Sequence, residues 1–163
     1  MLRHAKIVMT FALSAFAFLA TFNNVTDYGS NFEFVKHVLS MDTTFQSAMY
    51  RSIDVPALWH LAYWIIIAGE GLTFLLLFMG ALKMFLARSA PAEEFDRSKR
   101  LMAAGAVTGF LVWFFLFMVV GGEWFLMWQS PTWNGQEAAF RFYMTILVVL
   151  VFVIQPERDN RKA

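Results

Sequence analysis

The chain has 163 residues, of which 59% are hydrophobic and 18% aromatic, and its mean hydropathy is +0.55. This balance is too apolar for a soluble domain of this length, so the chain is predicted to lie in a lipid bilayer. The net charge of +1 gives no field that favours nucleic acid, and the absence of cysteine excludes disulfides, thiolate nucleophiles and cysteine-ligated metal centres.

The first apolar run covers residues 7–22 and is slightly short of the roughly 20 residues that a bilayer core requires. Lys6 is expected to snorkel toward the headgroups, so that the residues before it complete the span. A cleaved signal peptide is the alternative, because a basic start precedes an apolar run that contains Ala15, Ala17 and Ala20. The run passes directly into an amphipathic segment, and this favours an uncleaved helix.

Residues 31–40 repeat with a helical period, in which polar residues recur at i, i+3, i+4 and i+7 from Glu33. Ser30 or Asn31 is expected to cap this helix, and Gly29 to supply the bend before it. Such a short amphipathic helix is predicted to lie in the membrane interface.

The same connection is rich in Asp and Asn, which raises the alternative of a calcium site. The residues concerned are Asp27, Asp42, Asp54, Asn23, Asn24 and Asn31. Their spacing matches no EF-hand loop, so capping and turn roles are the expectation. Asp54-Val55-Pro56 resembles a capped start to the next helix.

The second predicted span covers residues 57–82, and Glu70 lies near its middle. An ionised side chain at that depth costs about 3 kcal/mol, so a lone glutamate is expected to be neutral unless a cation lies near. Glu70 and Thr73 are therefore candidate functional or partner-contact residues. Glu70 is expected to serve either as a proton or cation site or as a structural hydrogen bond to another helix. The hydroxyl groups considered as its partners are those of Thr10, Ser14, Thr108 and Thr145.

Small residues predict close packing between the second span and the third, which covers residues 101–122. Gly69 and Gly80 share one face of the second span, and Gly105 and Gly109 form a GxxxG pattern on the third. Such residues let two helix backbones approach each other closely in lipid. Helix packing is the expected role of these glycines, with a substrate path as the alternative.

The fourth predicted span covers residues 138–154, and Arg141 lies near its outer end. Because the third and fourth spans are joined by a short loop, Glu123 at the end of the third is expected to form a salt bridge with Arg141. The alternative is that Arg141 faces an anionic ligand.

His37 and His60 are both expected near the outer side of the membrane, where two histidines are able to hold a haem. His37 falls on the polar stripe of its helix, whereas bis-histidine haem sites project both rings inward. Hydrogen bonding is therefore the expected role of both residues, and no cofactor is predicted.

Basic residues near the span ends predict the topology. They are Arg3 and Lys6 before the first span, Lys83, Arg88, Arg97, Lys99 and Arg100 between the second and third, and Arg158, Arg161 and Lys162 after the fourth. The other two connections hold only Lys36, Arg51 and Arg141. Both termini are therefore predicted to face the cytoplasm.

The stretch "NNVTDYGSNFEFVKHVLSMDTTF", together with four predicted spans in this length, resembles a bacterial family of predicted small integral membrane proteins of unknown function. The most specific pieces are Asn-Asn, Thr-Asp-Tyr, Asn-x-x-Phe-Val and His-Val-Leu-Ser-Met-Asp-Thr. The resemblance covers the whole chain and implies a protein of the Gram-negative inner membrane. It implies no activity and no site residues.

We therefore expect an all-α membrane protein, a single integral domain built as a four-transmembrane-helix bundle with one amphipathic interfacial helix. The sequence carries none of the common catalytic motifs. The leading expectation is a non-enzymatic accessory or scaffold subunit that packs against another membrane protein or against itself. The alternatives are a small ion or proton-coupled transporter or channel that uses Glu70, and a quinone- or haem-associated redox subunit.

Overall fold

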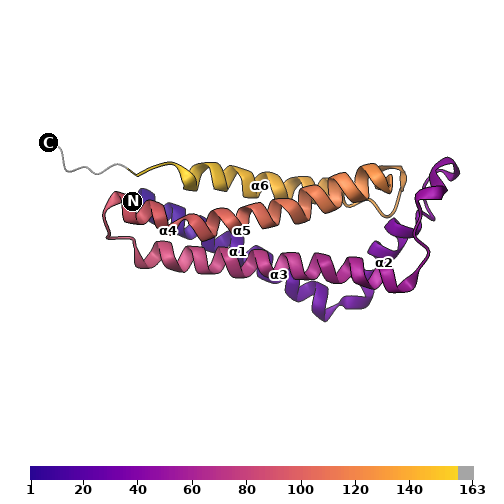
Figure 1. Cartoon of the computed structure of the whole chain (residues 1–163), viewed down its shortest axis with the longest axis horizontal. Coiled ribbons are helices and arrows are strands. Elements are labelled where there is room, and N and C mark those ends of the chain that lie inside the picture. The colour runs from indigo at the N-terminus through magenta and orange to yellow at the C-terminus, as the bar shows by residue number, and fades with distance from the viewer. Residues whose placement is uncertain (158–163) are drawn as a thin grey trace.

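The computed structural model describes residues 1–157, which form a bundle of long helices with two short 3₁₀ segments (Figure 1). The elements in chain order are α1 (Leu2–Thr26), α2 (Tyr28–Ser40), η1 (Gln46–Arg51), α3 (Pro56–Leu86), α4 (Ala92–Ser98), α5 (Arg100–Phe110), η2 (Leu111–Trp124), η3 (Met127–Gln129) and α6 (Gln136–Ile154). The predicted all-α class is confirmed.

Among the described residues, four helices are long and apolar enough to cross a membrane, and each contains one of the four predicted spans. They are Leu2–Thr26, Pro56–Leu86, Ala92–Trp124 and Gln136–Ile154. The first span is long enough without snorkelling, because its helix begins at Leu2. The residues before Lys6 complete the span as expected, but its side chain is only 1% exposed and pairs with Glu157 in place of snorkelling to the headgroups.

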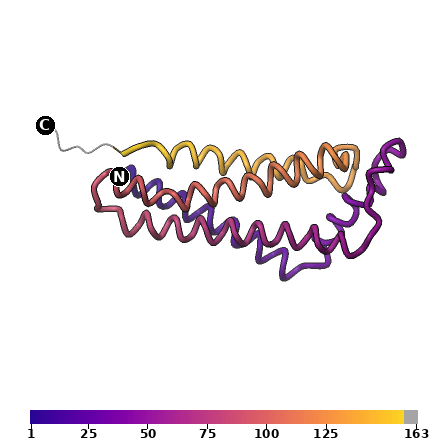
Figure 2. Tube along the Cα trace, in the orientation of Figure 1, coloured from indigo at the N-terminus to yellow at the C-terminus, as the bar shows by residue number. Residues whose placement is uncertain are grey.

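The long helices run side by side, and both ends of the described chain lie at one end of the bundle (Figures 1 and 2). This terminal end also holds α4, whereas α2 and η1 lie at the opposite end. α1 packs extensively along α3 and touches α6 at far fewer positions. α1 and α6 diverge toward the α2 end (Figure 2), and we call the line along which they face each other the seam.

α3 and the third span approach each other closely through glycines. A Cβ atom at Gly80 would lie 2.5 Å from the backbone nitrogen of Met102, and one at Gly105 would lie 2.9 Å from the backbone nitrogen of Leu77. Cβ atoms at the other two predicted packing glycines would also meet neighbouring helices: Gly69 would meet Val112, and Gly109 would meet Ile146 and Thr73. All four glycines therefore lie where helices touch.

The third span changes its winding after Phe110. From Leu111 to Trp124 it continues as a π-helix, and the N–H of Phe125 closes it by donating to the carbonyl of Val120 at 3.0 Å. A π-helix is wider than an α-helix and is rare at this length, and shorter π segments often lie at functional sites. Nothing in the hydropathy of this run distinguishes it from an α-helix.

The end of the bundle opposite the termini carries a cap, which we define as residues 41–53 and 125–135. Its interior is an apolar cluster that includes Met41, Ala48, Phe125 and Met127. The two parts of the cap are joined by a 2.7 Å hydrogen bond between the hydroxyls of Thr43 and Ser130. The cap therefore has a small packed core of its own.

The predicted start of the amphipathic helix is wrong in detail. α2 begins at Tyr28, directly after α1, and the bend between them lies at Asp27, whose φ of −115° and ψ of 54° leave the helical region. Gly29 lies inside α2, and no side chain caps its start, so neither Ser30 nor Asn31 has the predicted role. α2 contains the predicted helix 31–40, whose place in the membrane interface stays a prediction. α3 begins at Pro56 as expected, without a side-chain cap.

Candidate functional site

Glu70 is buried in the bundle with its side chain held by the end of α1. It is 3% exposed, and the amide nitrogen Nδ2 of Asn24 donates to its Oε2 atom at 2.7 Å. The hydroxyl of Tyr63 donates to the backbone carbonyl and to Oδ1 of the same asparagine, at 3.0 and 3.1 Å. The four predicted hydroxyl partners of Glu70 are wrong, and Thr73 instead donates to the carbonyl of Gly69 in its own helix.

Helix geometry explains why these three residues meet. Tyr63 lies two turns before Glu70, so both project from the same face of α3. Asn24 lies in the last turn of α1, where backbone carbonyls have no partner within the helix. The Tyr63 hydroxyl donates a hydrogen bond to that carbonyl. The side-chain amide of Asn24 in turn donates to Glu70.

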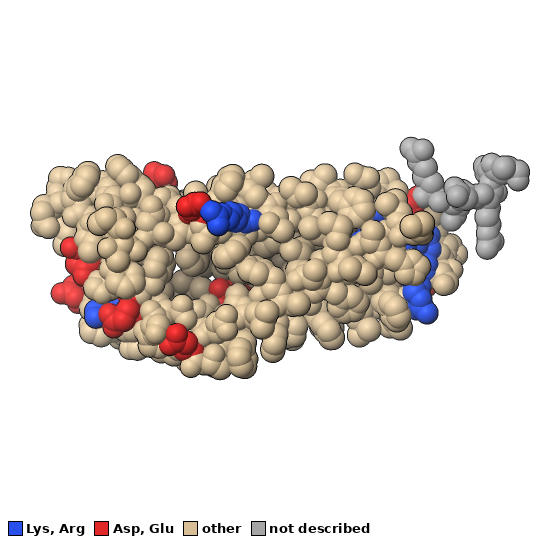
Figure 3. Space-filling view, turned by 180° about the vertical axis from the view of Figure 1, so that it is seen from behind, with Lys and Arg blue, Asp and Glu red and all other residues tan. Residues whose placement is uncertain are grey.

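Glu70 lines a chamber of about 510 Å³ between α1, α2, α3, η2 and α6. Its polar lining comes from Asn23, Asn24, Asn31, Tyr63 and Glu70. Its apolar lining includes Phe16, Ala20, Trp113, Phe117 and Phe142. The rear face of the molecule has a hollow in which an acidic side chain is visible (Figure 3). We call this space the Glu70 chamber.

The bundle interior between the Glu70 chamber and the terminal end is packed. Leu77, Ala81, Met84 and Met102 fill it, and each is at most 1% exposed. The chamber therefore belongs to the half of the bundle nearer α2.

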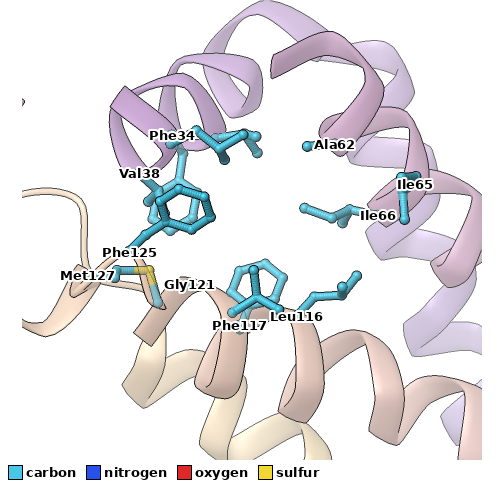
Figure 4. Close-up of a pocket in the computed structure, with 13 residues that line it drawn as sticks. Phe34, Val38, Ala62, Ile65, Ile66, Leu116, Phe117, Gly121, Phe125 and Met127 are labelled. Carbon is cyan, nitrogen blue, oxygen red and sulfur yellow. The ribbon is translucent and has the colours of Figure 1, made fainter. Parts of the chain in front are cut away.

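A smaller apolar cavity of about 130 Å³ lies beside the chamber, between α2, α3 and η2. Phe34, Val38, Ile66, Phe117 and Phe125 point into it (Figure 4). Side chains from α2, α3 and η2, together with Phe125 and Met127 of the cap, surround the space without a charged group in its lining. A cavity with such walls is expected to stay dry, because water would find no polar partners there.

The two predicted site histidines lie in separate aromatic contacts. His60 accepts from or donates to the Tyr28 hydroxyl at 2.8 Å and stacks on Phe32, with ring centroids 4.1 Å apart. His37 stacks on Trp133 at 4.5 Å, and its Nδ1 lies 2.5 Å from Asp42. Each imidazole thus has its own aromatic and polar partner.

The predicted salt bridge between Glu123 and Arg141 is wrong. Arg141 pairs with Glu137, one turn earlier on α6, and both side chains are highly exposed. The pairing within one helix needs no bridge across the loop, which explains the difference. The backbone carbonyl of Glu123 accepts a long hydrogen bond from Arg51.

A second polar cluster, which the sequence did not suggest, joins the two ends of the described part of the chain. Nζ of Lys6 lies 2.6 Å from Oε1 of Glu157 and donates to the carbonyl of Gln155 at 2.7 Å. Nζ of Lys99 donates to the same carbonyl at 2.8 Å, and Arg3 pairs with Glu157 at 3.3 Å. Burial by itself would raise the pKa of Glu157, but the hydrogen bond from Lys6 and the nearby cations lower it.

Sequence reasoning identified Glu70, considered Asn24 only as a calcium ligand or turn residue, and did not assign Tyr63 or this terminal cluster to a site. The spacing of Tyr63 and Glu70 on one helix face was an available signal. Asn24 gave none, because its contact depends on how α1 crosses α3.

A family model described as "predicted small integral membrane protein (DUF2165)" matches residues 2–156. No curated protein and no solved structure matches the chain.

Proposed function

Because the chain belongs to this family of predicted small integral membrane proteins, we propose that it is a non-enzymatic accessory subunit whose cap docks on another membrane protein or on a second copy of itself. The observation that carries the proposal is the outer surface of the cap. It exposes Phe45 by 62%, Tyr50 by 79%, Trp124 by 56% and Trp128 by 52%. Trp124 directly precedes the cap and is counted with this surface.

The cap holds these rings on a well-braced backbone. The N–H of Phe45 donates to the side chain of Gln129 at 2.9 Å, and the N–H of Ile53 donates to the carbonyl of Leu39 at 2.8 Å. The indole of Trp59 donates to the carbonyl of Ile53 at 2.7 Å. A rigid scaffold lowers the conformational entropy that a surface loses on binding.

The composition of this surface suits a protein partner. The guanidinium of Arg51 lies 5.4 Å from the ring centre of Tyr50 and 5.5 Å from that of Trp124. Trp, Tyr and Arg are the residues that most often dominate binding energy at protein interfaces. Anchoring in lipid headgroups uses Trp and Tyr as well, so the two roles have to be separated by experiment.

Co-purification tests the proposal. The tagged protein is extracted in mild detergent as the parent, as the double variant Tyr50→Ala/Trp128→Ala, and as Phe115→Ala. Phe115 is a matched control, because its ring is 48% exposed on the membrane-spanning part of η2. We expect a stoichiometric partner or a defined oligomer with the parent and the control, and its loss with the cap variant. A monomeric parent without a partner, or equal recovery from the cap variant, would contradict the proposal.

The proposed location is a bacterial inner membrane with both termini in the cytoplasm and the cap outside. The charge distribution supports this orientation: basic side chains gather at the terminal end, and acidic ones are more frequent at the other end (Figure 3). The described basic residues of the terminal end include Arg3, Lys83, Arg88 and Arg97, whereas Arg158, Arg161 and Lys162 lie outside the described residues. Basic flanks tend to stay on the cytoplasmic side during insertion.

The chain has no cysteine, so single cysteines test the orientation directly. Ser47 in the cap and Ser89 between α3 and α4 are both exposed. In cells with a permeable outer membrane, a membrane-impermeant maleimide is expected to label Ser47→Cys. It is expected to label Ser89→Cys only after the inner membrane is opened. The reverse pattern would overturn the orientation and leave the cap proposal standing.

A further inference from the structure

We propose that the Glu70 chamber and the seam beside it bind a membrane amphiphile with an uncharged, hydroxylated aromatic head and a single apolar tail, which is the chemistry of a prenylated or alkylated hydroquinone. The inference goes beyond the accessory role. It does not depend on what the cap binds, because the chamber and the cap surface use different residues.

The chamber offers hydrogen-bond acceptors that are not fully used. Asn24 donates to Oε2 of Glu70, and among the described residues Oε1 makes no hydrogen bond. That oxygen is also not sealed in the interior, because no buried side-chain oxygen or nitrogen of the described residues lacks a partner. Oε1 is therefore accessible, and it lines the chamber as the acceptor for a hydroxyl group.

Amides at the mouth of the chamber supply further polar contacts. The side chain of Asn31 donates to the carbonyl of Asp27 at 3.1 Å, which leaves its own oxygen as an acceptor. Asn23 lines the chamber as well. These groups lie on α1 and α2, on the side of the chamber nearer the cap, so a hydroxylated ring can be contacted at two ends.

Aromatic side chains form the opposite walls. Phe16 of α1 lies 5.2 Å from Trp113 of η2 and 4.8 Å from Phe142 of α6, measured between ring centroids. Offset and edge contacts at such distances suit another flat ring. The volume of about 510 Å³ lies within the range of ligand pockets, about 300–1,000 Å³.

The tail has a path along the seam between α1 and α6. A second hollow of about 340 Å³ is lined by Met9, Ala12, Leu13, Phe16, Phe142, Thr145 and Val149. Phe16 and Phe142 line both spaces, so the hollow adjoins the chamber on the side toward the terminal end, with this ring pair at the boundary. Leu19, which is 54% exposed, lines the chamber at its side, which places the entrance on the lipid-facing surface.

The charges of the site favour an uncharged head over a phospholipid. The lining of the chamber contains the carboxyl group of Glu70 and no lysine or arginine. A phosphate placed there would lie beside a carboxyl group, and the lining contains no cation to neutralise the negative charge. Hydroxyl groups on an aromatic ring need only acceptors and apolar walls, which the chamber provides.

Binding to the purified full chain in lipid nanodiscs tests the inference, with two probes: a decyl-substituted hydroquinone and hydroquinone without a tail. The two are kept reduced, and affinity is measured by isothermal titration calorimetry. The decisive pair of variants is Ala20→Phe, which fills the chamber, and Ala15→Phe, which adds the same ring to α1 at an exposed position that lines neither space.

We expect Ala20→Phe to abolish binding of both probes and Ala15→Phe to leave it unchanged. Ala12→Phe lies in the tail hollow and is expected to weaken the decyl probe while sparing the tailless one. Glu70→Gln is expected to weaken both probes about tenfold, because the amide keeps its oxygen toward Asn24 and turns an NH2 group, which cannot accept a hydrogen bond, toward the hydroxyl of the probe. The cap variant Tyr50→Ala/Trp128→Ala is expected to bind like the parent, which separates this inference from the docking proposal.

A probe that binds Ala20→Phe and Ala15→Phe equally would overturn the inference, as would a parent that binds neither probe. If Ala20→Phe fails to fold, a decyl probe with a photoreactive tail end decides: crosslinks at Met9, Ala12 or Val149 support the site, and crosslinks confined to other faces refute it. Stoichiometric phosphatidylethanolamine retained in the chamber and not displaced by the hydroquinone would also refute the proposed head chemistry.

Discussion

Asn24 connects two helices through one side chain, which makes it the sharpest single-residue test of the Glu70 site. Asn24→Ala removes the donor to Glu70 and one of the two acceptors of the Tyr63 hydroxyl. We expect the free energy of unfolding to fall by about 1–3 kcal/mol, because buried polar groups lose partners. Asn23→Ala is the control, since Asn23 is exposed on the same turn. Equal thermal unfolding of the two variants in detergent would show that the contact contributes little.

At Gly80, an added side chain would collide with the backbone of the third span. A Cβ there would lie 2.5 Å from the nitrogen and 2.9 Å from the Cα of Met102, and neither atom can move without shifting the third span. Gly80→Ala is expected to destabilise the protein by about 1–3 kcal/mol through overpacking.

Gly71→Ala is its control, because a Cβ at Gly71 would meet only a methyl group of Thr21 at an ordinary 3.6 Å. The melting temperature in detergent is the measurement for both variants. A melting temperature of Gly80→Ala at or above that of Gly71→Ala would mean that the helices have room to separate.

Among the elements, the cap has one hydroxyl that forms hydrogen bonds in both of its parts. Ser130 bonds Thr43 at 2.7 Å and accepts from the N–H of Trp133 at 2.8 Å, so it joins both parts of the cap. Ser130→Ala is expected to loosen the cap and leave the spans unchanged, with faster amide hydrogen exchange in residues 41–53. Ser47→Ala, at an exposed site in the cap, should exchange like the parent. Exchange that rises throughout the bundle instead would show that the cap does not open as a separate unit.

The membrane-crossing elements were predictable from sequence, and their ends were not. Hydropathy identifies each span because lipid demands a long apolar run. Helix ends depend on where backbone groups find partners, and here no side chain caps α2 or α3. The bend at Asp27 depends on one residue leaving helical geometry, which composition does not reveal.

The candidate site was likewise predictable only in part from the sequence. Glu70 was identified because a carboxyl group is costly at membrane depth. Its partner was wrongly assigned to hydroxyl groups, since the crossing of α1 over α3 brings the last turn of α1 against Glu70. Arg141 was paired across a loop, although a carboxylate one helical turn away was nearer. Contacts within one helix follow from spacing, whereas contacts between helices require the packing.

The whole bundle is closed at its terminal end by Glu157, which joins the end of the described chain to its beginning. Its side chain is 9% exposed and pairs with Lys6, which is almost completely buried, and with Arg3. Asp96 of α4 accepts from the backbone N–H of Glu157 and from Lys99, so the cluster also holds α4. Loss of one member leaves Lys6 with fewer partners in a buried position, and such a loss is costly.

Glu157→Gln is therefore expected to lower the free energy of unfolding by about 2 kcal/mol at neutral pH. The effect has a defined pH dependence. The pKa of Glu157 is lowered in the folded protein, so its carboxylate stabilises the fold above the ordinary value of 4.5, and this contribution is lost as the pH falls through the folded pKa. The difference in the free energy of unfolding between parent and variant should be full at neutral pH and shrink only below about pH 4.5.

Glu93→Gln is the control, because Glu93 pairs with Arg97 on an exposed surface where ion pairs contribute little. Thermal unfolding in detergent across this pH range measures both, and a difference that persists unchanged at pH values well below the folded pKa would show that Glu157 acts through packing and not through its charge.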